Sequence, residues 1–111
     1  MRSLPVSVLC HTCTLNDVVR DDYQNEYDRF VANLERVRLE PSVQRIIDAA
    51  GQDVQCAAVL YFDARVSTPH GQTFDIGQSI VFDGDRYRVA DIQRLYDRNR
   101  LHHLEVTLID G

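Results

Sequence analysis

The residues with the most evident capacity for chemistry are two cysteines three positions apart, Cys10 and Cys13, with His11 between them. A redox role for such a pair requires the first thiol at a helix N-terminus, where the dipole lowers its pKa. The surrounding residues, rich in Val, Thr and Leu, instead predict a strand, and residues three apart on a strand point to opposite faces. The pair is therefore predicted to be neither a redox centre nor a chelating site.

Other catalytic or metal sites have less support still. A zinc site needs a second pair of ligands, and His102 and His103, as neighbours on a predicted strand, are expected to face apart. A nucleophile formed by either cysteine with His70 lacks an orienting group, and Cys56 borders an apolar run that predicts core. The paired acids fall in predicted turns, where Asp bonds the local backbone: Asp21, Asp22, Asp83 and Asp85. The sequence thus predicts no catalytic residue, no metal and no cofactor.

The charged residues are unevenly distributed. All twelve basic residues are arginine and seventeen residues are acidic, so the net charge is −5, which disfavours general nucleic-acid binding. GC-rich codon usage is one explanation for the missing lysine, and the suitability of arginine for interface ion pairs is the other. Five arginines fall in one segment opposed only by Asp91 and Asp97: Arg86, Arg88, Arg94, Arg98 and Arg100. This favours head-to-tail association between copies; a solvated hairpin edge is the alternative.

The segments that carry these residues are predicted to be strands. Hydrophobic patterning over 111 residues predicts one domain, 1–111, that is all-β, a small β-barrel or sandwich of six to eight short strands with one long loop. The chain has no apolar run long enough to span a membrane, and its thiols are expected to be reduced. Strands are expected at 6–15, 35–40, 56–63 (covered on both faces), either side of Asp83–Gly84, and 102–109.

Shorter segments are less uniform in pattern. Residues 16–25 are polar and predict a turn or loop, while 27–34 fit either a strand or a helix. Residues 45–50 fit a short helix or, preferably, a hairpin through 49–52. Asp83–Gly84 favours a type I′ turn, and the apolar parity shifts near Ala90–Asp91, which predicts a bulge.

The long loop covers residues 65–77. Loops of this length in a small domain are usually functional or mobile. The stretch of interest within it comprises Ser67, Thr68, Pro69, His70, Gly71, Gln72 and Thr73.

Four motifs occur in order between Val37 and Ile109: VRLEPS, VLYFDARVSTP, FDIGQSIVFDGDRYRV and LYDRNRLHHLEVTLI. In this order they resemble the phage minor capsid family of small head–tail connector proteins. The closing L-Y-D followed by L-H-H-x-E-V is the most specific part. One departure is Gln78, where the family pattern favours Asp after the glycine.

The resemblance implies a non-enzymatic component of the neck of a tailed phage. Such a protein is similar to head-completion, or stopper, proteins, which form a cyclic ring, expected to be twelve-fold, beneath the portal. The implied partners are other copies of the chain, a portal or adaptor protein above, a tail-completion or tail-terminator protein below, and DNA that passes without sequence-specific binding. The resemblance also implies that the protein is part of the virion, is assembled in the bacterial cytoplasm and has no membrane partner.

Two surfaces acquire expected roles from this resemblance. The five arginines of residues 86–100 are assigned to the subunit interface, and residues 67–73 to a loop facing the channel. Two alternatives stay open: a tail-completion or tail-terminator ring, and an SH3-like or OB-like binding module.

Overall fold

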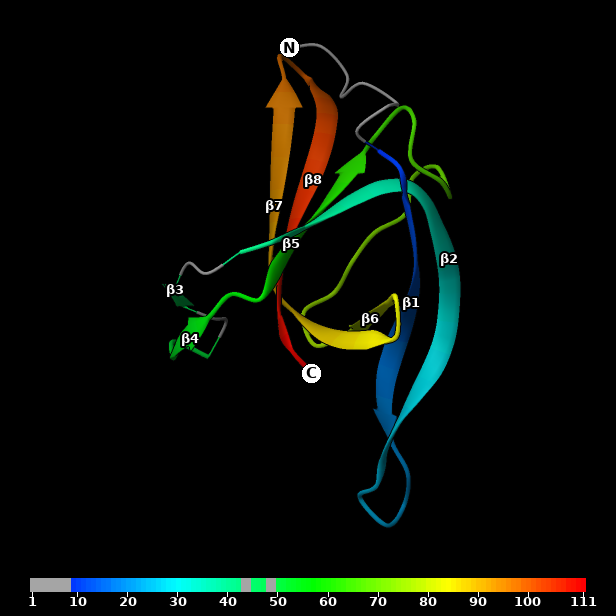
Figure 1. Cartoon of the computed structure of the whole chain (residues 1–111), viewed down its shortest axis with the longest axis vertical. Helices are drawn as coiled ribbons and strands as arrows, with labels where there is room; N and C mark the ends of the chain where they lie inside the picture. The colour runs from blue at the N-terminus through cyan, green and yellow to red at the C-terminus, as the bar shows by residue number, and fades with distance from the viewer. Residues whose placement is uncertain (1–8, 43–44, 48–49) are drawn as a thin grey trace.

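A computed structural model describes residues 9–42, 45–47 and 50–111, and every regular element in these residues is a strand (Figure 1). Six strands close into an antiparallel barrel in the order β1-β2-β5-β8-β7-β6. Two more form a separate small sheet. The strands are β1 (His11–Arg20), β2 (Glu26–Pro41), β3 (Arg45–Ile47), β4 (Asp53–Gln55), β5 (Ala58–Asp63), β6 (Ser79–Phe82), β7 (Asp85–Asp97) and β8 (Arg100–Asp110). The all-β prediction is confirmed, and of the two expected architectures, barrel or sandwich, the chain forms the barrel.

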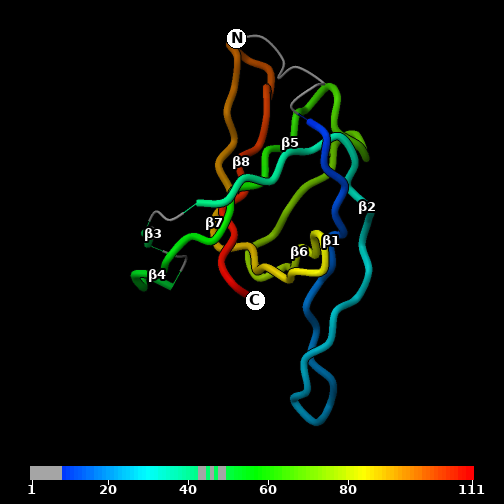
Figure 2. The backbone as a smooth tube through the Cα atoms, in the orientation of Figure 1, coloured from blue at the N-terminus to red at the C-terminus, as the bar shows by residue number. Residues whose placement is uncertain are grey.

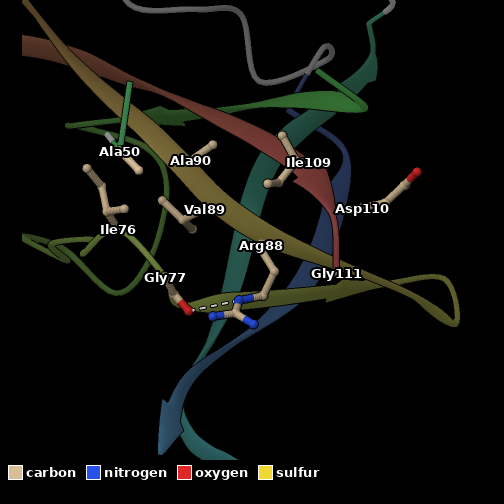
Figure 3. A pocket seen from close by; sticks show the side chains of 9 residues that line it. All are labelled: Ala50, Ile76, Gly77, Arg88, Val89, Ala90, Ile109, Asp110 and Gly111. Carbon is tan, nitrogen blue, oxygen red and sulfur yellow. Dashed lines mark hydrogen bonds between the residues drawn. The ribbon is translucent and has the colours of Figure 1, made fainter. Parts of the chain in front are cut away.

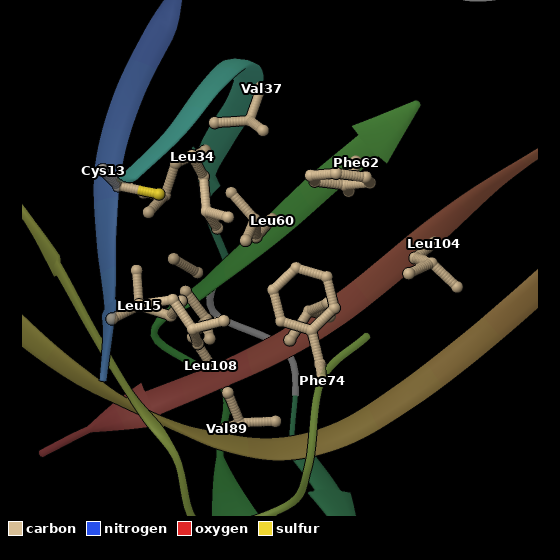
Figure 4. Packing of buried hydrophobic residues seen from close by; sticks show 14 residues of the cluster. Cys13, Leu15, Leu34, Val37, Leu60, Phe62, Phe74, Val89, Leu104 and Leu108 are labelled. Carbon is tan, nitrogen blue, oxygen red and sulfur yellow. The ribbon is translucent and has the colours of Figure 1, made fainter. Parts of the chain in front are cut away.

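Alternating side chains fill the barrel interior. In β8, Leu104, Val106 and Leu108 point inward, as their period-2 spacing predicts. Leu60 and Phe62 of β5 meet them (Figure 4). Other strands complete the cluster with Cys13, Leu15, Leu34, Val37, Leu39, Ile80 and Val89. The expectation that β5 is covered on both faces is wrong, because its outward side chains, such as Val59 and Tyr61, remain partly exposed.

The barrel closes through its shortest pairing. Strand β6 joins β1 over only three residue pairs, Thr14↔Val81, Leu15↔Ile80 and Asn16↔Ser79. By comparison, β5 and β8 pair over six residues.

Two long hairpins project from the barrel as ribbons. The β1–β2 hairpin and the β7–β8 hairpin extend toward opposite ends of the long axis (Figures 1 and 2), and the molecule measures 46 × 28 × 27 Å. The predicted loop at 16–25 is wrong over residues 16–20, which belong to β1; the turn itself spans only 21–25. Residues 16–20 pair with 26–30 of β2 through their backbones although their side chains show no apolar alternation. The ambiguous segment 27–34 is strand.

Local turn signals are confirmed. Asp83 and Gly84 both have positive φ, 51° and 83°, and Phe82 pairs with Asp85 around them, as a type I′ turn requires. The predicted bulge at Ala90–Asp91 is present as a register shift between Val89 and Asp91. The preferred hairpin near residue 50 is present as β3 and β4, although its Ala49, like residues 6–8 of the first expected strand, lies outside the described residues.

Candidate interaction surfaces

The two thiols of the Cys-x-x-Cys pair lie in different environments. Cys10 is exposed, whereas Cys13 points into the core, where burial raises the pKa of its thiol to about 12. Between them, the His11 ring contacts Phe82 at 4.9 Å between centroids, and its Nδ1 accepts a hydrogen bond from the Leu39 backbone N–H at 3.0 Å. His11 therefore joins β1 to β2, a structural role.

The prediction that His102 and His103 face apart is wrong. Both rings are buried, and their Nδ1 atoms lie 2.6 Å apart, within hydrogen-bond distance. Leu95 pairs with His103 and Tyr96 with Leu101, so His102 sits in a bulge that turns its ring toward its neighbour. Burial lowers the pKa of His103. Within residues 9–42, 45–47 and 50–111, no three potential ligands group around a metal position.

The five arginines expected at an interface divide into two groups. Arg86 and Arg88 lie near the barrel and already contact β2. Arg86 binds the Asp28 carboxylate through two hydrogen bonds, which raises its own pKa and lowers that of Asp28. Arg88 donates to the Gly77 carbonyl at 3.0 Å and lies 3.6 Å from the Glu26 carboxylate. These two side chains are therefore already engaged by β2 and the long loop within the chain.

The second group occupies the β7–β8 ribbon. Arg94, Arg98 and Arg100 are exposed there. Nearby, Tyr96 is 54% exposed. No salt bridge within the described part of the chain involves any of these three arginines. They are the members of the predicted set that remain available to a partner.

The stretch 67–73 is anchored at its start. The buried Ser67 hydroxyl accepts a hydrogen bond from the Asp63 backbone N–H at 2.9 Å and donates one to the Arg36 carbonyl. Thr68 exchanges both backbone hydrogen bonds with Glu35 of β2. The peptide bond that follows, to Pro69, is cis. Ser67 and Thr68 are thus fixed to the barrel wall, and the exposed residues of the stretch are Pro69, His70, Gly71 and Thr73, with Gln72 partly exposed.

The far end of the loop is also anchored. The Phe74 ring is buried against Phe62, edge to face, at 5.6 Å (Figure 4). The buried Gln78 accepts from the Asp75 backbone N–H at 2.7 Å and donates to the Asp17 carboxylate at 2.9 Å, a bond that helps to lower the pKa of Asp17. A carboxylate at position 78 would have no proton to donate there, which explains why an amide is suitable at this position.

Sequence reasoning missed an exposed aromatic surface on the β1–β2 ribbon. Tyr23 is 85% exposed, Phe30 61% and Tyr27 53%, and Val31 is exposed beside them. Large apolar side chains exposed on a projecting ribbon are typical of contact surfaces, and Tyr27 and Phe30, three apart on β2, present them on both of its faces. The available signal was the recurrence of aromatics among the acids of residues 21–30.

An open pocket of about 410 Å³ lies beside the end of β8 (Figure 3). Ile76, Val89 and Ile109 contribute its apolar wall, and the Arg88 guanidinium, bonded to the Gly77 carbonyl, borders it. Because its one cationic side chain is already bonded within the chain, this pocket offers a partner mainly apolar surface.

Comparison with known protein families gives a match to most of the chain. The model of a family described as "Minor capsid protein" matches residues 5–108. No curated protein matches the chain. The part of the chain that the structure describes has no helix suited to crossing a membrane.

Proposed function

The chain belongs to the minor capsid protein family, and we propose that it is the head-completion protein of a tailed phage, forming a ring beneath the portal. Membership makes it a structural component of the phage virion. The family match over residues 5–108 is the observation that carries the finer proposal. The proposal adds to this membership a ring, its twelve-fold symmetry and its place in the neck.

Side chains fill the barrel interior, so a single copy has no internal channel. Leu15, Leu60, Val106 and Leu108 are fully buried inside the barrel, as is usual for barrels of this size. DNA cannot pass through a single copy, so any DNA passage made by this protein must lie between copies. The net charge of −5 then suits a passage through which DNA slides without binding tightly.

The exposed part of the long loop is the segment we assign to that passage. Pro69, His70, Gly71 and Thr73 project between two anchored ends, Ser67–Thr68 and Phe74. A loop held in this way can carry its tip to a defined position with little loss of conformational entropy. In this proposal the portal or an adaptor lies above the ring and a tail-completion or tail-terminator protein lies below.

Electron microscopy of the purified full chain, alone and mixed with portal, tests the ring. We expect closed rings that cap the portal. A chain that remains monomeric in both samples overturns the proposal and favours a binding module instead.

Phage lacking the protein distinguish head completion from tail termination. We expect heads that have lost packaged DNA and detached tails of normal length. Full heads accompanied by tails of uncontrolled length would show a terminator instead and overturn the head-completion role.

The loop assignment has its own test. The triple variant His70→Ala, Gln72→Ala and Thr73→Ala should assemble normally and release packaged DNA faster than wild type. Asp85→Ala, an exposed change at the start of β7, is the control and should retain DNA. Equal DNA retention by both would exclude the loop from the passage.

A further inference from the structure

We infer that the tip of the β1–β2 ribbon of one copy docks on the β7–β8 ribbon of the next copy. The "acidic ribbon" is residues 17–31 and the "basic ribbon" residues 94–101. This inference rests on the proposed ring and specifies which surfaces close it.

The acidic ribbon carries unbalanced charge at its tip. Residues 17–31 contain five acids and two arginines. Three of the acids are paired within the chain: Asp17 with Arg29, Glu26 with Arg20, and Asp28 with Arg86. The excess negative charge is therefore concentrated in the turn, at Asp21 and Asp22.

The shape of that turn is fixed by its own hydrogen bonds. The Asp21 carboxylate accepts from the backbone N–H groups of Tyr23 and Asn25 at 2.8 and 2.9 Å. The Asp21 backbone N–H donates to the Asn25 carbonyl at 3.0 Å. A turn ordered before contact loses less entropy on binding than a flexible loop does.

The same ribbon presents aromatic surface to solvent. Tyr23, Tyr27 and Phe30 are each more than half exposed. No described part of the same chain covers them. Tyrosine and arginine are among the residues enriched in the energetic centres of protein interfaces, so these exposed aromatic rings favour a partner that carries arginine.

The basic ribbon has the matching chemistry. Residues 94–101 contain three arginines and one acid. Arg94, Arg98 and Arg100 are exposed, and Tyr96 stands among them. Arginine planes stack on tyrosine rings and also bind carboxylates bidentately. One surface can therefore accept both the acids and the aromatics of the acidic ribbon.

The placement of the ribbons identifies the partner as a second copy. Because the ribbons project toward opposite ends of the molecule (Figure 1), they cannot meet within one chain. Each copy carries both members of the complementary pair, so the contact is heterologous and repeats from copy to copy. Such a contact closes into a ring when the rotation between copies allows it.

Paired charge reversals test the contact, measured by sedimentation velocity and electron microscopy. The first variant is Arg94→Glu with Arg100→Glu, and the second is Asp22→Arg with Gln24→Arg, which leaves the capping Asp21 intact. We expect each variant alone to associate at least tenfold more weakly than wild type. Unchanged thermal unfolding shows that each variant is folded.

Mixing the two variants is the decisive step. In the mixture every contact again joins opposite charges, so assembly should return, and a chain with all four changes should assemble alone. Arg45→Glu and Asp53→Arg, exposed changes in the separate β3–β4 sheet, are the matched controls and should assemble as wild type does.

The outcomes separate the two proposals. If both reversed variants form rings as readily as wild type does, the ribbon docking is overturned and the proposed ring stands. Open filaments that respond to the reversals would support docking and overturn the ring. A wild-type chain that stays monomeric with portal would overturn both.

Discussion

Arg86 holds Asp28 through two hydrogen bonds, from Nε to Oδ2 at 3.0 Å and from Nη2 to Oδ1 at 2.8 Å. The two residues belong to β7 and β2, which β6 and β1 separate in the order of the barrel. Both side chains are about two-thirds buried. This ion pair therefore ties together strands that share no backbone pairing.

Removing either partner of this pair should destabilise the barrel modestly. Solvent screens part of the attraction, so a double-mutant cycle with Arg86→Ala and Asp28→Ala should give a coupling free energy of about 1 kcal/mol. Urea denaturation at pH 7 measures it. Arg65→Ala, at an exposed position, is the control and should change the free energy of unfolding by less than about 0.5 kcal/mol.

The coupling should depend on pH in one direction. The hydrogen bond from Arg86 lowers the pKa of Asp28 below its ordinary value of 3.8. The stabilisation is therefore fully present above that value and is lost as the pH falls through the lower pKa of the folded state. Unfolding of wild type and Arg86→Ala, compared at pH 6 and below pH 3, should show the difference shrinking in acid; a constant difference would contradict the ion-pair account.

Ser67 should matter for folding although it lies in the stretch expected to face a channel. Ser67→Ala removes the donor to the Arg36 carbonyl and the acceptor for the Asp63 N–H in a buried position. We expect a loss of about 1–3 kcal/mol in the free energy of unfolding. His70→Ala, three residues away and exposed, should cost less than about 0.5 kcal/mol. Equal effects would show that Ser67 is not an anchor.

Phe74 should contribute as a core residue would. Phe74→Ala opens a cavity beside Phe62 and should lower the free energy of unfolding by about 3–5 kcal/mol. Phe74→Leu keeps most of the volume and should cost about 1.5 kcal/mol or less. Chemical denaturation monitored by circular dichroism ranks the two variants, and a Phe74→Ala chain as stable as wild type would place the loop outside the core.

The three cysteines should differ in reactivity. Cys10 is exposed, whereas Cys13 and Cys56 are buried, and the raised pKa of Cys13 leaves little thiolate at neutral pH. A short pulse of maleimide on the folded chain should label one thiol per molecule, and the denatured chain should take up three. Mass spectrometry counts the labels. A Cys10–Cys13 disulfide after mild oxidation would contradict the opposed placement of the two thiols.

Features with local causes could be predicted from the sequence. Asp83–Gly84 specifies its turn through the φ angles that Asp and Gly tolerate, and Leu104, Val106 and Leu108 specify an inward face through their spacing. Residues 16–20 escaped prediction because the sequence Asn-Asp-Val-Val-Arg has no alternation of apolar and polar side chains, although the segment is paired as a strand.

Features set by register or by distant strands could not be predicted. His102 and His103 meet because a bulge shifts the pairing of β7 and β8, which depends on both strands together. The five arginines form one segment in the sequence, yet Asp28 and Glu26, far away in the chain, bind two of them. The division between structural and available arginines exists only once β2 is in place.

The three-pair junction of β1 and β6 gives the barrel one weak side. Backbone amides there are held by the fewest neighbouring ladder bonds, so their protons should exchange with deuterated solvent before those of the six-pair junction of β5 and β8. Each opening would turn the closed barrel briefly into a curved open sheet with two unpaired edges. If neighbouring subunits pack against that side, these amides should exchange more slowly in the assembled protein than in the single chain.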